Sequence, residues 1–272
     1  MDFKTAIETV PAAETIYDGI QEQNIELDYI LPDYYPDIFR LIHCEAVPVI
    51  TGFSVSGDKL SYEMRCDIRI LYCGEGGSLL QSVEQHQNFS KTVDIGKVCG
   101  SPEISLLPKA DHINFRAVNK RRLDMRGAVS VKIKVNGESS QEVISDAFGM
   151  NIQLRKTAVQ FASKKLSAEK IVQLSEDIEL SSAQPEAVNI IKVRSKAIEC
   201  EEKMVSGKLL AKGKIEAEIL YSCETDGEYA VEPLSFSMDY SQIIDIDGLD
   251  ENFICTVCPE IVSCLSIASA ST

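Results

Sequence analysis

Tryptophan is absent from this 272-residue chain, histidine occurs three times, and no apolar run approaches the roughly 20 residues of a membrane-spanning helix. The N-terminus, Met1–Thr5, has neither the basic segment nor the apolar run of a secretory signal. His43, His86 and His112 share no metal-ligand spacing, and no Gly-x-Ser-x-Gly motif of a serine hydrolase occurs. These absences disfavour a membrane-spanning protein, a secreted protein and the common catalytic motifs.

Positive charge is in the minority, because 27 lysines and arginines stand against 42 acidic residues and give a formal net charge of −15. Such a surface repels the phosphates of nucleic acid, so we expect no nucleic-acid partner. One basic group, Lys120-Arg121-Arg122, lies at the entry to a predicted strand among acidic neighbours. There it is more typical of an exposed strand end than of a binding patch.

Nine cysteines allow two sharper interpretations, a disulfide framework or a metal site. The odd count and the absence of a signal favour reduced thiols. Cys255 and Cys258 form one close pair with Cys264 nearby, whereas structural zinc commonly takes two such pairs. On a strand, this spacing would also send the two thiols to opposite faces. We therefore expect free cysteines, no metal, no cofactor and no catalytic residue. A carboxylate pair for glycoside hydrolysis is left open, although no motif positions one.

The chain repeats itself at a distance of 149 residues. Without a gap, the segment Leu31–Tyr72 aligns with Leu180–Tyr221. Identical residues meet at Leu31 and Leu180, Pro36 and Pro185, Ile42 and Ile191, Lys59-Leu60 and Lys208-Leu209, and Ile70-Leu71-Tyr72 and Ile219-Leu220-Tyr221. A step of this length is that of a domain, since solenoid repeats span roughly 20–50 residues. The sequence therefore predicts a duplicated domain.

Both copies alternate apolar and polar residues with the period of a β-strand, at Leu60–Tyr72 and at Leu209–Tyr221. A third alternating run, Leu123–Val135, is followed by Asn136-Gly137, a strong tight-turn signal. Half-buried antiparallel strands need a second layer over their apolar face. We therefore predict a mainly β chain with two tandem antiparallel β-sandwich or open-barrel domains related by duplication, and with Tyr72 and Tyr221 at equivalent core positions.

We place the first domain, with an N-terminal arm, at residues 1–147 and the second at residues 148–272. Helix is expected to be scarce. The segments Pro36–Ile42 and Pro185–Ile191 each begin with a proline and an acid, which suit a helix start. Either segment is a turn or two of helix or an extended chain.

The segment before the first long hairpin is a candidate interaction loop, because it combines prolines, acids and tyrosines. Proline restricts the backbone, aspartate favours turns, and exposed tyrosine is enriched at interfaces. The residues concerned are Pro32, Asp33, Tyr34, Tyr35, Pro36 and Asp37. The counterpart in the second copy, Leu180–Glu186, keeps the leucine, the second proline and one acid but contains no tyrosine. The segment is either a rigid connector or a binding loop.

The run Leu31–Ile38, the hairpin that ends in Ile70-Leu71-Tyr72 and the segment Ile113–Leu123 resemble the SPOCS domain. This bacterial domain occurs in tandem in SipL-like spore-coat assembly proteins. The resemblance covers nearly the whole chain, residues 20–147 and 165–272. It implies a non-enzymatic protein that tethers the developing coat through a coat morphogenetic ATPase, in the mother-cell cytoplasm at the forespore surface. Relatives of this kind usually end in a LysM module.

The second copy departs from this pattern at its end. Pro102-Glu103-Ile104 matches Pro259-Glu260-Ile261, but only 11 residues follow Ile261, whereas the first copy continues through the 123–135 strand. We therefore expect the second domain to be C-terminally truncated, without a counterpart of that strand. No LysM module is present either, which indicates part of a longer protein. Because unpaired edges recruit other chains, we expect the second half to be less stable than the first and to self-associate.

The preferred function is that of a non-enzymatic scaffold or interaction protein whose partners are other proteins. The alternative is a module for cell-wall glycan or another polymer, in which two copies give avidity. A glycan site would need aromatic side chains on an exposed face. Tryptophan is absent, and the best tyrosines fall on the predicted buried face or at Tyr34 and Tyr35. This distribution favours the scaffold.

Overall fold

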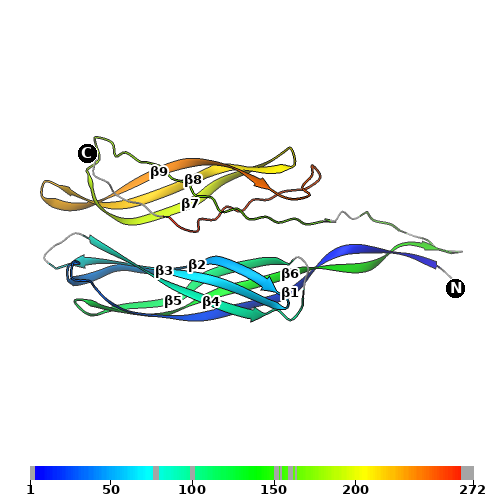
Figure 1. The fold of residues 1–272 in the computed structure, drawn as a ribbon, viewed down its shortest axis with the longest axis horizontal. Helices are drawn as coiled ribbons and strands as arrows, with labels where there is room; N and C mark the ends of the chain where they lie inside the picture. Colours follow the sequence, from blue (N-terminus) through cyan, green and yellow to red (C-terminus); the bar gives the residue numbers. More distant parts are fainter. Residues whose placement is uncertain are drawn as a thin grey trace.

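The computed structural model describes residues 4–75, 80–98, 102–149, 153, 155–158, 162 and 164–264. Within these residues there are nine β-strands and no helix, and the strands form three open antiparallel sheets of three strands each (Figure 1). The prediction of a mainly β chain is confirmed. No helix that could cross a bilayer is found in the described part of the chain.

Six strands of the first copy form two sheets that pack face to face as a β-sandwich (Figure 1). One sheet has the order β1-β6-β5, and the other has the order β2-β3-β4. The strands are β1 (Lys4–Ile30), β2 (Ile38–Ser56), β3 (Lys59–Gly74), β4 (Leu80–Asp94), β5 (Glu103–Asn119) and β6 (Arg122–Phe148). In each sheet the central strand is one of the alternating runs read from the sequence.

The core of the sandwich lies between β3 and β6. Every second residue of β3 from Leu60 to Tyr72 is at most 3% exposed, and so are Leu123, Met125 and every second residue from Val129 to Val135 on β6. The polar residues between them face away from the core, as strand geometry requires. The alternation in the sequence therefore predicted the buried face of both central strands.

Gly127 marks a close approach of two strands in the middle of β6. A Cβ atom at this position would lie 2.4 Å from the carbonyl oxygen of His112. The register of β5 on β6 shifts between Ala110 and His112, which brings the β5 backbone toward β6. Glycine is therefore needed here for space, as is common where a strand bulges.

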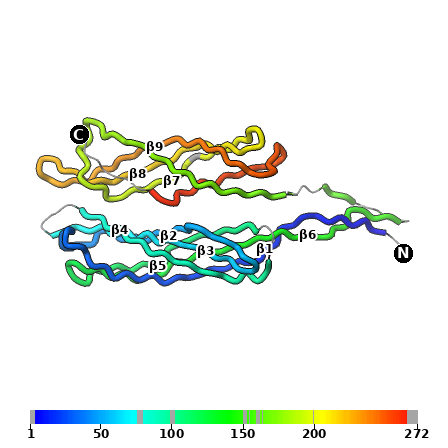
Figure 2. Tube along the Cα trace, viewed as in Figure 1, coloured from blue at the N-terminus to red at the C-terminus, as the bar shows by residue number. Residues whose placement is uncertain are grey.

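Strand β6 continues to Phe148 and does not end at Asn136-Gly137. The predicted turn was wrong because β1 extends past this point and supplies backbone partners, with Lys4 opposite Phe148. The Thr15 hydroxyl donates a 3.0 Å hydrogen bond to Oδ1 of Asn136. Since β5 pairs only as far as Asn136, the rest of β1 and β6 forms a two-stranded ribbon beyond the sandwich (Figure 2).

The second copy forms one sheet with the order β7-β8-β9. Its strands are β7 (Ala187–Val205), β8 (Lys208–Thr225) and β9 (Glu228–Asp245). The register of β7 on β8 shifts at Ala187/Asn189 and at Ile190/Lys192, and that of β2 on β3 shifts at Ile38/Arg40 and at Leu41/His43. These two bulges recur at the 149-residue spacing of the sequence repeat, so the duplication extends to local backbone irregularities.

Tyr72 and Tyr221 occupy the equivalent buried positions that the sequence predicted, with 0% and 1% of their surfaces exposed. Of the two structures left open for Pro36–Ile42 and Pro185–Ile191, the extended one is observed, since β2 begins at Ile38 and β7 at Ala187. Pairing with a long neighbouring strand provides backbone hydrogen bonds that a helix of one or two turns cannot match.

The second copy has one sheet where the first has two. Described residues 164–186 and 246–264 contain no strand, although they correspond to the part of the chain that flanks β2-β3-β4 in the first copy. Both segments run as extended chain along the β7-β8-β9 sheet (Figure 2). The apolar residues of β8 from Leu209 to Cys223 are nevertheless mostly buried beneath them.

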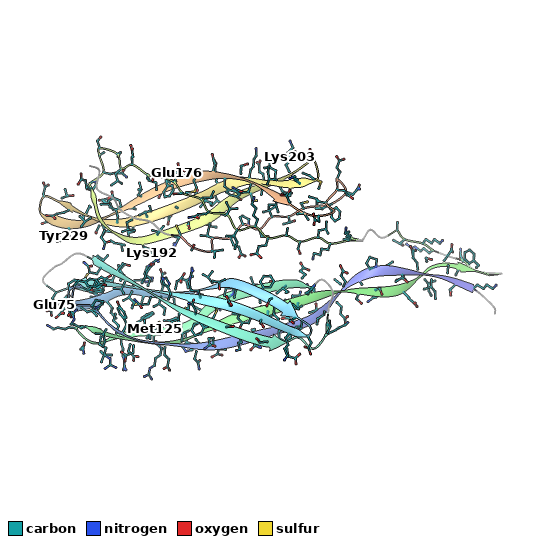
Figure 3. All side chains as sticks on the ribbon, in the orientation of Figure 1. Glu75, Met125, Glu176, Lys192, Lys203 and Tyr229 are labelled. Atoms are coloured by element: carbon teal, nitrogen blue, oxygen red, sulfur yellow. The ribbon has the colours of Figure 1, made fainter. Side chains whose placement is uncertain are left out.

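The two copies touch along the outer face of the β2-β3-β4 sheet. Nζ of Lys192 on β7 donates to Glu45 Oε2 at 2.7 Å, and Arg65 Nη2 donates to the carbonyl oxygen of Val262 at 3.2 Å. Figure 3 shows Lys192 on the side of the second copy that faces the first. Both of these contacts are polar, in contrast to the apolar core inside the sandwich.

Candidate interaction loop

The candidate loop, Leu31–Asp37, crosses from β1 in one sheet to β2 in the other. Leu31 is 1% exposed and anchors the loop in the core. The backbone N–H of Tyr35 donates to the carbonyl oxygen of Pro32 at 3.0 Å and closes a tight turn. The prolines and the aspartate at the turn thus produce the local geometry that they favour in sequence.

The tip of the β5–β6 hairpin fastens both ends of this loop. The backbone N–H of Leu31 donates to the carbonyl oxygen of Arg121 at 2.8 Å, and that of Ile38 donates to the carbonyl oxygen of Lys120 at 2.7 Å. The two ends of the loop are therefore held by a strand pair that lies about ninety residues further along the chain. Lys120 also forms an ion pair with Glu75 at 2.5 Å.

The guanidinium group of Arg121 clamps the interior of the loop. Nη1 donates to Asp37 Oδ1 at 2.7 Å, and Nη2 donates to the carbonyl oxygens of Pro32 and Leu31 at 2.6 and 3.1 Å. A further bond of 3.3 Å joins Nη1 to the carbonyl oxygen of Tyr35. The N–H donors of arginine form a planar fork on separate nitrogen atoms, a geometry that the single ammonium nitrogen of lysine cannot reproduce. Arg121 therefore fixes the loop in one conformation.

Tyr72 supports the loop from below. Its hydroxyl donates a 3.0 Å hydrogen bond to the carbonyl oxygen of Pro36. Burial raises the pKa of Tyr72 to about 12, with a smaller contribution from Tyr35. The hydroxyl is therefore protonated and able to donate at neutral pH.

The exposed part of the loop is Asp33 and Tyr34, which we name the Asp33–Tyr34 tip. Tyr34 is 81% exposed, and the Asp33 side chain lies fully in solvent, 3.6 Å from Arg121. The ring of Tyr34 packs against that of Tyr35 in a tilted arrangement, with 4.7 Å between the ring centroids. Burial raises the pKa of Tyr35, with a smaller effect of Tyr34. An aromatic ring and a carboxylate thus project from a fixed base.

The same turn exists in the second copy, where the described residues include no counterpart of the Arg121 clamp. The backbone N–H of Gln184 donates to the carbonyl oxygen of Ser181 at 2.9 Å, at the 149-residue spacing from Tyr35 and Pro32. The Gln184 side chain accepts from the Ser181 backbone N–H at 2.9 Å. The hydroxyl of Tyr221 is buried and has no hydrogen-bond partner among the described residues. The structure thus brings the predicted site residues together in the first copy and leaves the second copy without an equivalent tip.

A charged group joins the two copies around Glu45. Its carboxylate accepts from Lys192 at 2.7 Å and lies 3.4 Å from His43 Nε2 and 3.5 Å from Arg69 Nη1. Burial raises the pKa of the Glu45 carboxyl, but the hydrogen bond and charge of Lys192, together with His43 and Arg69, outweigh burial and hold this pKa below its ordinary value. The carboxylate is therefore stabilised in its ionised form by the contact between the copies.

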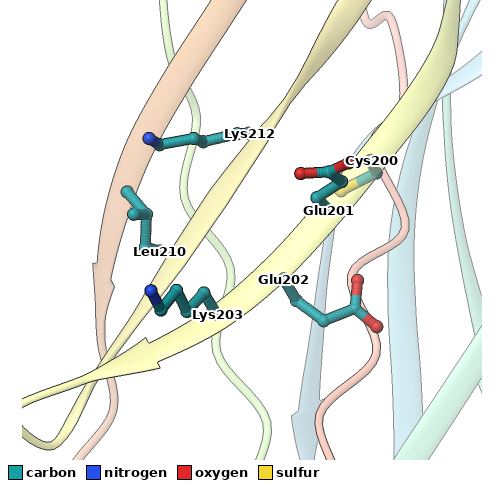
Figure 4. Close-up of a pocket in the computed structure, with 6 residues that line it drawn as sticks. All are labelled: Cys200, Glu201, Glu202, Lys203, Leu210 and Lys212. Carbon is teal, nitrogen blue, oxygen red and sulfur yellow. The ribbon is translucent and has the colours of Figure 1, made fainter.

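A shallow hollow lies on β7 and β8. Figure 4 shows Lys203, Leu210 and Lys212 directed to one side and Glu202 to the other. The hollow is lined by Cys200, Glu201, Glu202, Lys203, Leu210 and Lys212. This set does not include histidine, the usual base beside a catalytic cysteine. Burial raises the pKa of neighbouring Tyr240 to about 12, with a further contribution from its hydrogen bond to Cys200. The hollow has no arrangement that we assign to catalysis.

The cysteines that the structure describes are all free thiols. Cys255 is half-buried, and Cys258 and Cys264 are exposed. Within the described residues, no group of three or more histidine, cysteine or acidic side chains is arranged to hold a metal ion. Cys99 lies outside the described residues.

Sequence reasoning missed the role of Arg121. It placed Lys120-Arg121-Arg122 at the entry to a strand and disfavoured a binding patch. In the structure the three side chains pair with Glu75, with the loop and with Asp28 inside the first copy. The sequence did contain a signal, because a basic triplet and an acidic, proline-rich loop occur in the same copy. Their contact could not be predicted, because it depends on the topology, which places the β5–β6 hairpin beside the β1–β2 connection.

The chain was compared with models of known protein families. Residues 186–265 match a protein-family model described as SipL, SPOCS domain. This stretch contains β7, β8 and β9, and the match confirms the family resemblance seen in the sequence. No curated protein and no solved structure matches the chain.

Proposed function

We propose that this chain, whose residues 186–265 are a SPOCS domain, is a non-enzymatic scaffold in the assembly of the bacterial spore envelope. The SPOCS domain of SipL indicates a sporulation-related role in protein interaction, and its family is not a known enzyme family. The proposed location is the mother-cell cytoplasm at the forespore surface. The proposed partner is another protein, by family resemblance a coat morphogenetic ATPase.

The observation that supports this proposal best is the Asp33–Tyr34 tip on its fixed base. Binding by a mobile loop costs the entropy of ordering it, and a loop that is already ordered avoids much of that cost. Here Arg121 and Tyr72 hold the backbone, while Asp33 and the ring of Tyr34 remain in solvent. A tyrosine beside a carboxylate suits a partner pocket with an apolar wall and a basic rim.

The test is a comparison of Tyr34→Ala and Asp33→Asn with the unaltered chain, each immobilised and exposed to extract of sporulating cells. Tyr229→Ala is the matched control, because Tyr229 is a 52% exposed tyrosine outside the loop, in the β8–β9 hairpin of the second copy. We expect a protein retained by the unaltered chain and by the control to be lost with Tyr34→Ala. Equal retention by all four chains would contradict the proposed binding surface.

Co-sedimentation with purified peptidoglycan separates the scaffold from a glycan-binding module. A scaffold that binds through a protein partner stays in the supernatant. Sedimentation that persists in Tyr34→Ala would contradict the scaffold role and would favour glycan recognition elsewhere on the chain.

A further inference from the structure

Lys164–Leu180 is an extended chain without a strand partner, and we name it the open segment. Within the described residues its backbone makes no hydrogen bond to another backbone group. Its counterpart in the first copy, at the 149-residue spacing, is the part of β1 that pairs with β6 along its length. The open segment therefore occupies the position of a sheet strand while its backbone donors and acceptors remain available. Such an edge is a template for pairing with another chain.

Several apolar side chains of the open segment are exposed. Ile171 is 79% exposed, and Leu174 is 39% exposed, whereas Ile25, which corresponds to Leu174, is 1% exposed. Val172 and Ile178 are each 37% exposed. Burial of this surface against a second layer would be favourable, at roughly 25 cal/mol for each Å² of apolar area covered.

Charge is distributed unevenly along the open segment. Its first half carries Lys164, Lys165 and Lys170 with a single acid, Glu169, and its second half carries Glu176, Asp177 and Glu179. The open segment of a second molecule, aligned in parallel, would place like charges side by side, which destabilises a strand pair. Aligned antiparallel, the two molecules place the basic half of each open segment beside the acidic half of the other.

We propose that the open segment is a self-association site, in which it pairs antiparallel with the open segment of a second copy of this chain about a two-fold axis at Val172. In this register Val172 lies opposite Val172, Leu166 lies opposite Ile178, and Lys165 lies opposite Glu179. Six of the nine even-numbered positions are then apolar and share one face with Lys164, Lys170 and Glu176, whereas the odd-numbered face is polar apart from Ile171. No two like charges are directly opposed. The interface is isologous and closes as a dimer.

Two lysines of the open segment already have contacts inside the chain. Lys165 forms an ion pair with Glu103, and Lys170 Nζ donates to the carbonyl oxygen of Ile243 at 2.7 Å. Both lysines are exposed, so these contacts are exchanged at little cost for a cross-strand pair. The proposed dimer does not involve the Asp33–Tyr34 tip, which lies in the first internal repeat. A failure of the dimer would therefore leave the proposed binding of a protein partner by that tip untouched, and the reverse also holds.

Sedimentation equilibrium of the full chain tests the pairing through a charge swap. We expect the unaltered chain to dimerise. Lys165→Glu should weaken the dimer on the order of tenfold, because glutamate then faces Glu179 twice across the two-fold axis. The double variant Lys165→Glu with Glu179→Lys should restore dimerisation, since opposite charges meet again. Lys203→Glu, an exposed lysine on β7, makes the same charge change outside the segment and should leave dimerisation unchanged.

A disulfide test locates the contact. In a chain with the exposed Cys258 and Cys264 changed to serine, Val172→Cys should form an intermolecular disulfide on mild oxidation. Ile254→Cys, at a residue that is 99% exposed, is the control for random collision and should cross-link much less. A chain that stays monomeric, a double charge variant as weak as Lys165→Glu, or equal cross-linking at both positions would overturn the proposal.

Discussion

The hydroxyl of Tyr72 donates a 3.0 Å hydrogen bond to the carbonyl oxygen of Pro36, whereas Tyr221, at the equivalent position of the second copy, has a buried hydroxyl without a partner in the described part of the chain. The sequence that ends in each tyrosine is the same, Ile-Leu-Tyr. The difference therefore comes from the segment that packs against the hydroxyl end of each ring. In the first copy Arg121 holds the loop that contains Pro36 against Tyr72. The described residues of the second copy contain no counterpart of that clamp.

Removal of the two hydroxyls should therefore have different effects on stability. Tyr72→Phe leaves the Pro36 carbonyl unpaired and should lower the free energy of unfolding by about 1 kcal/mol. Tyr221→Phe removes a buried, unsatisfied polar group and should be neutral or stabilising by up to about 1 kcal/mol. Urea denaturation followed by circular dichroism measures both, and an equal loss in the two variants would contradict the structural difference.

Replacement of Arg121 should loosen the candidate loop more than it disturbs the sheets. Arg121→Ala leaves several carbonyl oxygens and Asp37 without donors, at a cost of about 2–3 kcal/mol. Arg121→Lys should recover only part of this loss, because an ammonium group cannot reach the same acceptors in one plane. Arg116→Ala is the control, since Arg116 is 70% exposed and pairs with Asp124 at the surface. Chemical denaturation orders the three variants, and similar stability of Arg121→Ala and Arg116→Ala would rule out the clamp.

The contact between the copies should depend on pH through Glu45. The pKa of this carboxyl is below its ordinary value of 4.5 in the folded chain. Ionised Glu45 therefore contributes stability above pH 4.5, and this contribution is lost as the pH falls through the folded pKa. An NMR titration of Glu45 should show a higher pKa in Lys192→Ala than in the unaltered chain. Lys203→Ala is the control, and no change in Lys192→Ala would contradict the ion pair.

Thiol reactivity should separate the described cysteines. Burial raises the pKa of Cys44 and of Cys66 to about 11, so the reactive thiolate is rare in both at neutral pH. Cys258 and Cys264 are exposed. Brief alkylation of the folded chain, followed by mass spectrometry, should label the two exposed thiols first and Cys44 and Cys66 last. Rapid labelling of Cys66 would show that the core of the sandwich opens easily.

The sequence predicted the fold where side-chain pattern alone decides it. Alternation at Leu60–Tyr72 and Leu123–Val135 is a local signal, and both runs became the central strands of the first sandwich. The turn signal at Asn136-Gly137 failed because β1, more than a hundred residues earlier in the chain, pairs across it. Strand pairing at that distance leaves no local trace in the sequence.

The residues of the candidate site could be predicted from the sequence, but the contacts that hold them could not. Pro32–Asp37 could be singled out because prolines, acids and tyrosines are rarely so dense. That Tyr34 is exposed while Tyr35 packs partly beneath it depends on the turn closed by Pro32 and Tyr35. The clamp by Arg121 depends on the topology, in which the β5–β6 hairpin lies beside the β1–β2 connection.

Hydrogen exchange gives the most direct test of the central claim, that two copies of one fold differ in how far their second sheet is formed. The measurement compares backbone amides of residues 164–180 with those of residues 15–31, at a concentration where the chain is monomeric. We predict that the amides of 164–180 exchange at least about 100-fold faster, because β1 is hydrogen-bonded to β6 and the open segment to no backbone group among the described residues. Equally slow exchange of both segments in the monomer would contradict the account.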